Sequence, residues 1–206
     1  GRTTPRPSMV VTNKKDGIYD YWKKMGELMW QESNFFDLSK DDLFGTKTKA
    51  FMFTSGVDTE YYEKTTDGWQ KASICKMNKN WRSMKGSQWV WIAESATPDE
   101  MKTGTKERFR LKVGLPVNRS SEHIVRADLF LRSSNECRLT INDTSMDQSY
   151  GGASYPEPFI VDVSKHLKGG ENEIGFELVS FARPNAEEVP SNLAGLIYRL
   201  HLEYRE

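Results

Sequence analysis

The sequence predicts an all-β protein, an antiparallel jelly-roll β-sandwich, with an N-terminal helical extension. Three observations lead to this fold class. From about residue 45 onward, apolar and polar residues alternate with a period of two, as in strands that bury one face. Turn-forming residues separate these runs, and no long helical pattern lies between them. An earlier segment, residues 16–33, instead has the spacing of an amphipathic helix.

The first 44 residues differ in character from the rest of the chain. Residues 1–15 are polar, contain two prolines and show no periodicity, so we interpret them as a flexible linker. A helical extension is expected over residues 16–44. Its apolar side chains recur at steps of three and four residues, at Ile18, Trp22, Met25 and Met29. Because such a stripe is rarely left in water, we expect it to pack on its own sandwich or, alternatively, on another chain.

The β-sandwich is expected over residues 45–206. Its clearest strands cover residues 108–113, 125–132, 173–178 and 194–205, where apolar positions alternate with polar ones. The run at residues 88–92 reads as a further strand that carries Trp89 and Trp91 in the core. Mid-strand positions of apolar parity should be almost completely buried, namely Phe109, Leu129, Leu139, Phe159, Phe176 and Leu200.

Charge and hydropathy exclude several classes of partner. The chain has 29 Lys and Arg residues and 29 Asp and Glu residues, so its formal net charge is zero. Binding to nucleic acid or to anionic lipid relies on a basic excess, which this balance does not provide. No apolar run approaches the roughly 20 residues of a membrane span. We therefore expect no nucleic-acid partner and no membrane span.

Residues with catalytic or metal-binding chemistry are sparse. The chain has three histidines, and none has a second histidine at metal-ligand spacing. His201 falls on the polar face of the last strand. Asp58 and Asp67 offer oxygen ligands near turns, but the dense spacing of a calcium loop is missing. We therefore expect no enzyme activity, no bound metal and no cofactor. Cys75 and Cys137 are expected to be small buried residues, although a disulfide between them remains possible.

Aromatic residues in polar, turn-like segments are the most informative candidates for a binding site. An aromatic ring can stack on the C–H face of a sugar while neighbouring polar groups bind its hydroxyls. The same rings could instead fill the edges of the core. The candidate ligand-binding residues are the aromatic Trp69, Trp81, Tyr150 and Tyr155, with Asn142 and Arg183 as polar partners.

Several segments in a consistent order resemble galactose-binding-like jelly rolls, over about residues 50–206. The most similar members are the accessory β-sandwiches of α-L-rhamnosidases and the sugar-binding domains of family 2 glycoside hydrolases. The family typically has glycine where this chain has Asp143, so the turn after Asn142 could differ. The segments that carry the resemblance are Asp67–Ala72, Asn80-Trp81, Gln88–Ile92, Arg108–Val113, Ala127–Leu131, Cys137–Asp143, Pro158–Val163, Leu167–Ile174 and Ala194–Leu200.

This resemblance implies a fold and leaves function open, because members bind sugars, act as spacers or contact proteins. Our first hypothesis is a non-catalytic carbohydrate-binding module of a secreted or cell-surface protein, whose partner is a glycan. The alternative is a structural or assembly domain of a surface, appendage or phage protein, whose partner is a protein. A third hypothesis is a spacer domain of a larger glycoside hydrolase.

Overall fold

The computed structural model describes residues 48–76, 80–117, 121–134, 136–152, 155–181 and 194–205. All of them belong to one compact unit, Asp42–Glu206. The expected linker and helical extension, over residues 1–44, lie outside the described residues, as does Arg183. Within the described ranges, no helix is both long and apolar enough to cross a membrane.

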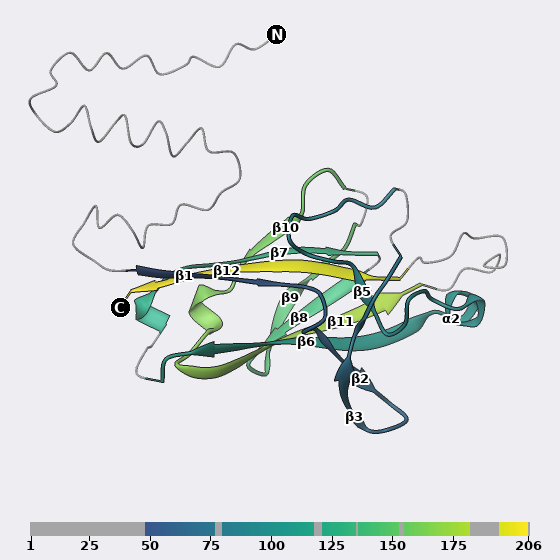
Figure 1. The fold of residues 1–206 in the computed structure, drawn as a ribbon, viewed down its shortest axis with the longest axis horizontal. Helices are drawn as coiled ribbons and strands as arrows, with labels where there is room; N and C mark the ends of the chain where they lie inside the picture. Colours follow the sequence, from purple (N-terminus) through teal and green to yellow (C-terminus); the bar gives the residue numbers. More distant parts are fainter. Residues whose placement is uncertain are drawn as a thin grey trace, which may run out of the picture. The chain divides into compact units, whose positions relative to one another are not determined.

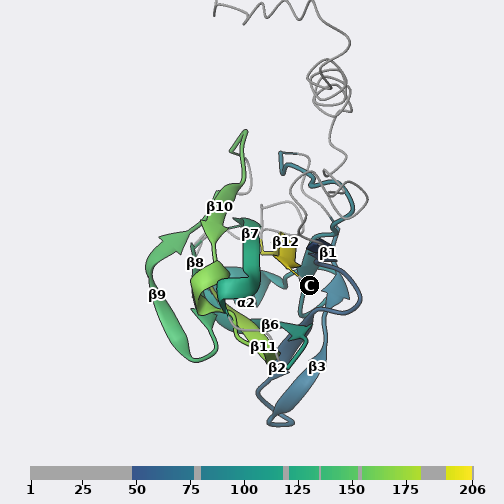
Figure 2. The same cartoon turned by 90° about the vertical axis from the view of Figure 1, so that its left-hand side faces the viewer.

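Two antiparallel sheets form the fold, which confirms the predicted all-β sandwich (Figure 1). The first sheet, called sheet A, has the order β10-β7-β12-β5-β4, and β1 pairs with β12 as well. The second, sheet B, has the order β3-β2-β6-β11-β8-β9. Figure 2 shows sheet B with β9 at one edge and β3 at the other.

Sheet A contains β1 (Thr48–Thr54), β4 (Ser73–Ile74), β5 (Val90–Trp91), β7 (Ile124–Ser133), β10 (Phe159–Asp162) and β12 (Leu196–Arg205). Sheet B contains β2 (Glu60–Glu63), β3 (Gly68–Lys71), β6 (Thr105–Leu115), β8 (Glu136–Ile141), β9 (Thr144–Tyr150) and β11 (Gly170–Ser180). The described helices are short: α2 (Pro98–Thr103) and the 3-10 turns η2 (Ser121–His123) and η3 (Ser164–His166).

The core lies between the two sheets and follows the predicted parity. Trp89 and Trp91 are buried as expected, although the strand around them is reduced to Val90–Trp91. Phe159 is the exception among the six predicted core positions, because it is only partly buried. It lies on β10, the edge strand of sheet A, which pairs with β7 on one side only. Its ring packs near Tyr150. The other five are at most 1% exposed: Phe109, Leu129, Leu139, Phe176 and Leu200.

Cys75 and Cys137 are both buried and are not joined by a disulfide. Cys137 is 0% exposed and lies on β8, as expected for a small core residue. Burial raises the pKa of its thiol well above the ordinary value. This thiol therefore acts as an apolar group in the folded protein.

A buried asparagine ties the two turns at one end of sheet B together. The Asn172 side chain is 0% exposed and accepts hydrogen bonds from the Lys168 backbone N–H at 2.8 Å and the Asn142 amide at 2.7 Å. Its own amide donates to the backbone carbonyl of Lys168 at 2.7 Å. Asn142 and Asp143 have φ values of 47° and 67°, so the turn between β8 and β9 forms without glycine.

His201 is more deeply buried than its place on the polar face of the last strand suggests. It lies on the outward parity of β12 and is nevertheless only 4% exposed, with the Phe130 ring 4.7 Å from its own ring. Burial lowers its pKa to about 4, and the nearby positive charges of Arg199 and Arg126 act in the same direction. The folded protein therefore holds this imidazole neutral at pH values where an unfolded chain would protonate it.

Replacing Leu139 by alanine should lower the free energy of unfolding by about 2–5 kcal/mol, because the side chain is fully buried opposite Phe176 and would leave a cavity. Urea denaturation of both proteins measures the difference. Lys106→Ala, at a side chain 60% exposed on sheet B, is the control and should change stability by less than about 0.5 kcal/mol. Equal stabilities for the Leu139 variant and the wild type would contradict the strand register.

Stability should decrease as the pH falls from about 6.5 to about 4, since only the unfolded state takes up the His201 proton in that range. This histidine contributes at most about 1.4 kcal/mol per pH unit to the slope. Denaturation midpoints measured at several pH values should show a shallower dependence for His201→Gln. His166→Gln serves as control, and a His201→Gln slope identical to that of the wild type would contradict the prediction.

Candidate functional site

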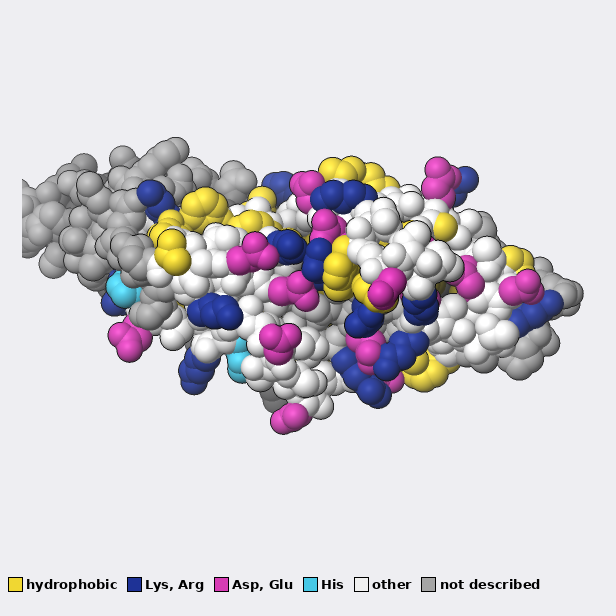
Figure 3. All heavy atoms as spheres, turned by 90° about the horizontal axis from the view of Figure 1, so that it is seen from below, with side chains coloured by type: hydrophobic (Ala, Val, Ile, Leu, Met, Phe, Trp, Pro, Cys, Tyr) yellow, Lys and Arg dark blue, Asp and Glu magenta, His cyan; other side chains and the backbone are white. Residues whose placement is uncertain are grey.

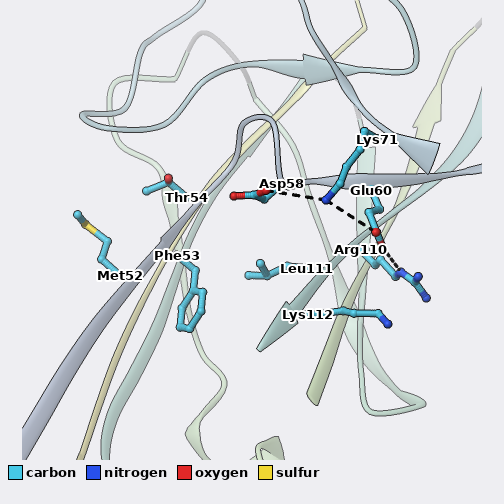
Figure 4. Close-up of a pocket in the computed structure, with 9 residues that line it drawn as sticks. All are labelled: Met52, Phe53, Thr54, Asp58, Glu60, Lys71, Arg110, Leu111 and Lys112. Carbon is cyan, nitrogen blue, oxygen red and sulfur yellow. Dashed lines mark hydrogen bonds and ion pairs between the residues drawn. The ribbon is translucent and has the colours of Figure 1, made fainter. Parts of the chain in front are cut away.

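A pocket opens at the side of the sandwich where β1 of sheet A faces β2 and β6 of sheet B (Figure 4). Its volume is about 430 Å³. The opening follows from the pairing of β2 with β6, which consists of two residue pairs and begins at Glu60 opposite Arg110. Beyond this point β6 continues past the start of β2. The pocket is lined by Met52, Phe53, Thr54, Asp58, Glu60, Lys71, Arg110, Leu111 and Lys112.

Arg110 is the most constrained charged residue of the pocket. Its Nε donates to Glu60 Oε2 at 2.7 Å, and its Nη1 donates to Glu173 Oε2 at 3.1 Å. The guanidinium carbon lies 4.0 Å from the centroid of the Trp69 ring. Two ion pairs and a cation–π contact hold the side chain, which is 15% exposed. Its position is therefore set before any ligand arrives.

Lys71 lies between two carboxylates at the mouth of the pocket. Its ammonium nitrogen is 3.8 Å from Asp58 Oδ1 and 3.9 Å from Glu60 Oε1, as the dashed lines in Figure 4 show. These distances are those of ion pairs, and they are too long for direct hydrogen bonds. The Lys71 and Asp58 side chains are 61% and 90% exposed, so both are open to solvent.

Aromatic rings and arginines alternate on the outer face of sheet B beside this pocket. The Trp69 and Tyr62 rings meet edge to face at 5.6 Å, and the Arg108 guanidinium lies 4.0 Å from the centroid of Tyr62. The Tyr62 hydroxyl donates to Asp67, which stands at the turn between β2 and β3. Figure 3 shows this side of the molecule, with Lys and Arg side chains interspersed with Asp and Glu.

Of the residues predicted from the sequence to bind a ligand, Trp69 adjoins the pocket through Arg110. Trp81 is 8% exposed and packs on Trp89, with their ring centroids 4.3 Å apart. Its ring also lies so close to Gly195 that a Cβ there would be 2.9 Å from it. Trp81 therefore fills the edge of the core in this structure.

Tyr150 and Tyr155 lie near each other, because both rings contact Phe159, at centroid distances of 5.8 and 6.2 Å. Tyr150 is 6% exposed, whereas Tyr155 is 57% exposed. The neighbouring strand β10 is at the edge of sheet A away from β1, since the order runs through β7 and β12 between them. These tyrosines thus lie on the other side of the sandwich from the pocket.

Asn142 occupies the turn between β8 and β9, where its side chain is engaged with the backbone. Its amide donates to the His166 carbonyl at 2.9 Å, and its Oδ1 accepts from the Glu173 N–H at 3.0 Å. The structure therefore does not gather the described candidate residues into one site. The pocket instead uses charged residues that were not among the predicted ligand-binding residues. They are Glu60, Lys71 and Arg110 on strands β2, β3 and β6, and Asp58 in the turn before β2, which the sequence offered only as a possible metal ligand.

Comparison with known proteins finds no matching family model and no matching curated protein. Among solved structures, an α-L-rhamnosidase from Streptomyces avermitilis complexed with L-rhamnose has 21% identity and a TM-score of 0.41, covering 61% of this chain and 12% of that one. A Ruminococcus gnavus β-glucuronidase in complex with uronic isofagomine has 9% identity and a TM-score of 0.43, with coverages of 74% and 28%.

A putative β-galactosidase from Bacteroides fragilis has 14% identity and a TM-score of 0.42, covering 74% of this chain and 23% of that one. The chain thus spans 12–28% of the length of these three enzymes. One of these enzymes is an α-L-rhamnosidase, a class that the sequence segments also resemble. The TM-scores of 0.41–0.43 are low, so the description of the fold rests on the strand pairing and not on these similarities.

Trp69 and Arg110 should be energetically coupled because the guanidinium lies over the indole. A double-mutant cycle with Trp69→Ala and Arg110→Ala, measured by urea denaturation, should give a coupling of about 0.5–2 kcal/mol. A second cycle with Trp69→Ala and Lys106→Ala is the control and should give additive effects. Additivity in the first cycle would show that the stack does not hold Arg110.

Proposed function

We propose that this chain is a non-catalytic carbohydrate-binding domain of a secreted or surface protein, with the pocket beside β1 as its sugar site. The observation that carries the proposal is the composition of that pocket. A side formed by Phe53 and Leu111 faces a charged rim in which Arg110 is held in place. A pyranose has the matching character, with C–H groups on its ring faces and hydroxyls at its edge.

The size of the pocket supports a ligand of one or two sugar rings. Small-molecule sites usually measure about 300–1,000 Å³, and this pocket has about 430 Å³. Because the rim residues Asp58 and Lys71 are largely exposed, the bound sugar would remain partly in water. Affinity should therefore be modest, with a dissociation constant of about 10 µM to 1 mM.

The carboxylates of the pocket support binding over hydrolysis. A glycosidase needs a carboxylic acid that stays protonated, usually in a buried and apolar setting. Asp58 is 90% exposed here, and Glu60 already accepts a hydrogen bond from Arg110. Both groups are better placed to accept hydrogen bonds from sugar hydroxyls.

Tyr155 is a proposed additional contact for a longer glycan. Its exposed ring packs over Gly152, where a Cβ would lie 2.4 Å from the ring, and near Phe159. The buried Arg132 donates to the backbone carbonyls of Tyr155 and Pro156. The ring is therefore held in one orientation toward solvent, as a stacking platform requires.

A second candidate function is assembly, either as a structural protein or as a spacer beside a catalytic domain. The observation that favours it is β1, a strand with Phe51 46% exposed and Met52 54% exposed. Exposed apolar strands are common sites of protein contact. Light scattering on the intact chain would reveal self-association, and a concentration-dependent mass that Met52→Lys abolishes would place assembly ahead of glycan binding.

A glycan array probed with the full chain should give binding to a defined class of sugar, followed by titration calorimetry on the best ligand. Lys71→Ala should weaken binding about tenfold by removing a donor at the rim. Lys106→Ala is the matched control, because both lysine side chains are about 60% exposed and ion-paired on sheet B. Absence of binding to every glycan would refute the proposed function, and equal affinities for both variants would place the sugar elsewhere.

A further inference from the structure

We infer that the pocket selects a neutral glycan with adjacent free hydroxyls over uronic-acid-containing or sulfated glycans. This inference rests on the proposed function and adds the chemical class of the ligand. It follows from the arrangement of charges around Lys71, from the ion pairs that Arg110 already forms, and from the apolar side of the pocket.

The charges around Lys71 suit ligand groups that both donate and accept hydrogen bonds. The ammonium lies 3.8 Å from the Asp58 carboxylate and 3.9 Å from the Glu60 carboxylate, just beyond direct hydrogen bonding. A hydroxyl placed against these three groups accepts from the ammonium and donates to a carboxylate. A second hydroxyl on the next ring carbon can do the same with the other carboxylate. A ligand carboxylate or sulfate can only accept, so it would satisfy Lys71 and leave both acidic groups opposed.

The cations of the pocket are already matched with carboxylates. Arg110 is paired with Glu60 and Glu173, and the Lys112 ammonium lies 3.4 Å from Glu171. An anionic ligand would have to displace one of these pairs before gaining a new one, whereas a hydroxyl can add to them. It would also approach Asp58 and Glu60 at the rim, where like charges repel. The net result is a site without electrostatic attraction for anions.

The apolar side of the pocket restricts the ligand further. Phe53 and Leu111 lie on one side of the pocket, below Asp58 and Lys71 in Figure 4. Leu111 is only 6% exposed, so the apolar surface that a ligand could cover is mainly that of the partly buried Phe53. Covering it favours a ring with an exposed C–H face over a small open-chain polyol. The ligand class is therefore a neutral pyranose residue with a free vicinal diol.

The test compares matched ligands on the full chain. Oligosaccharides of one backbone are titrated in three forms: neutral, oxidised to the uronic acid at C6, and sulfated. We expect the neutral form to bind at least about tenfold more tightly than either anionic form. Its affinity should also change less than about twofold between low and high salt, because no net charge is neutralised on binding.

Two acidic variants and a control identify the groups responsible. Asp58→Asn and Glu60→Gln remove the negative charges at the rim, so the preference for the neutral form should fall by about tenfold in the double variant. Glu177→Gln is the control, because its side chain is 27% exposed, close to the 25% of Glu60, and it pairs with Lys106 outside the pocket. The control should keep the wild-type preference.

The outcomes separate this inference from the proposed function. If no form of any glycan binds, the proposed function fails. If anionic forms bind more tightly and Lys71→Ala abolishes their binding, glycan binding stands and the selection of neutral ligands is overturned. If neutral glycans bind and the double variant retains the full preference, the rim does not select the ligand and the inference is overturned.

Discussion

The pairing of β6 with β11 determines both the core and the candidate site. The two strands are matched over eleven residue pairs, from Gly170 opposite Leu115 to Ser180 opposite Thr105. Inward positions such as Phe109 and Phe176 are directly opposite each other in the core. Because strand side chains alternate, the same register directs Arg110 outward toward Glu60 and Glu173. A slip of one residue would exchange the two faces and remove core and site together.

The parts of the fold that could be predicted from the sequence are those with local causes. Period-two alternation located long strands and five of the six core positions. The predicted full burial of Phe159 was wrong, because the parity of a residue cannot distinguish an edge strand from a central one. His201 lies on the polar parity of the last strand, as predicted, but parity did not reveal its burial, because burial of the outward face depends on what covers it. The short helix α2 was missed although Thr97 and Glu100 form a capping box there, a signal that the sequence carries.

The candidate site could not be predicted because its causes are not local. Glu60, Lys71 and Arg110 are outward-facing charges on three different strands, and each alone has the character of a solvated residue. What brings them together is the order β3-β2-β6 and a register in which Glu60 pairs with Lys71 on one side and with Arg110 on the other. Trp69 is a candidate because of its turn-like surroundings, and the contact that links it to the pocket is with Arg110, 41 positions further along the chain.

The asparagine at the turn between β8 and β9 has a consequence for chemical modification. Asn142-Asp143-Thr144 matches the acceptor pattern for N-linked glycosylation. Both amide protons are already used, one toward the His166 carbonyl and one toward Asn172 Oδ1. Attachment of an oligosaccharide replaces one of these protons and places a bulky group where the turn meets η3. In a eukaryotic secretory pathway, Asn142 would have to remain unmodified by the oligosaccharide-transferring enzyme until the turn had folded. A stably folded protein with a glycan attached to Asn142 would contradict this consequence.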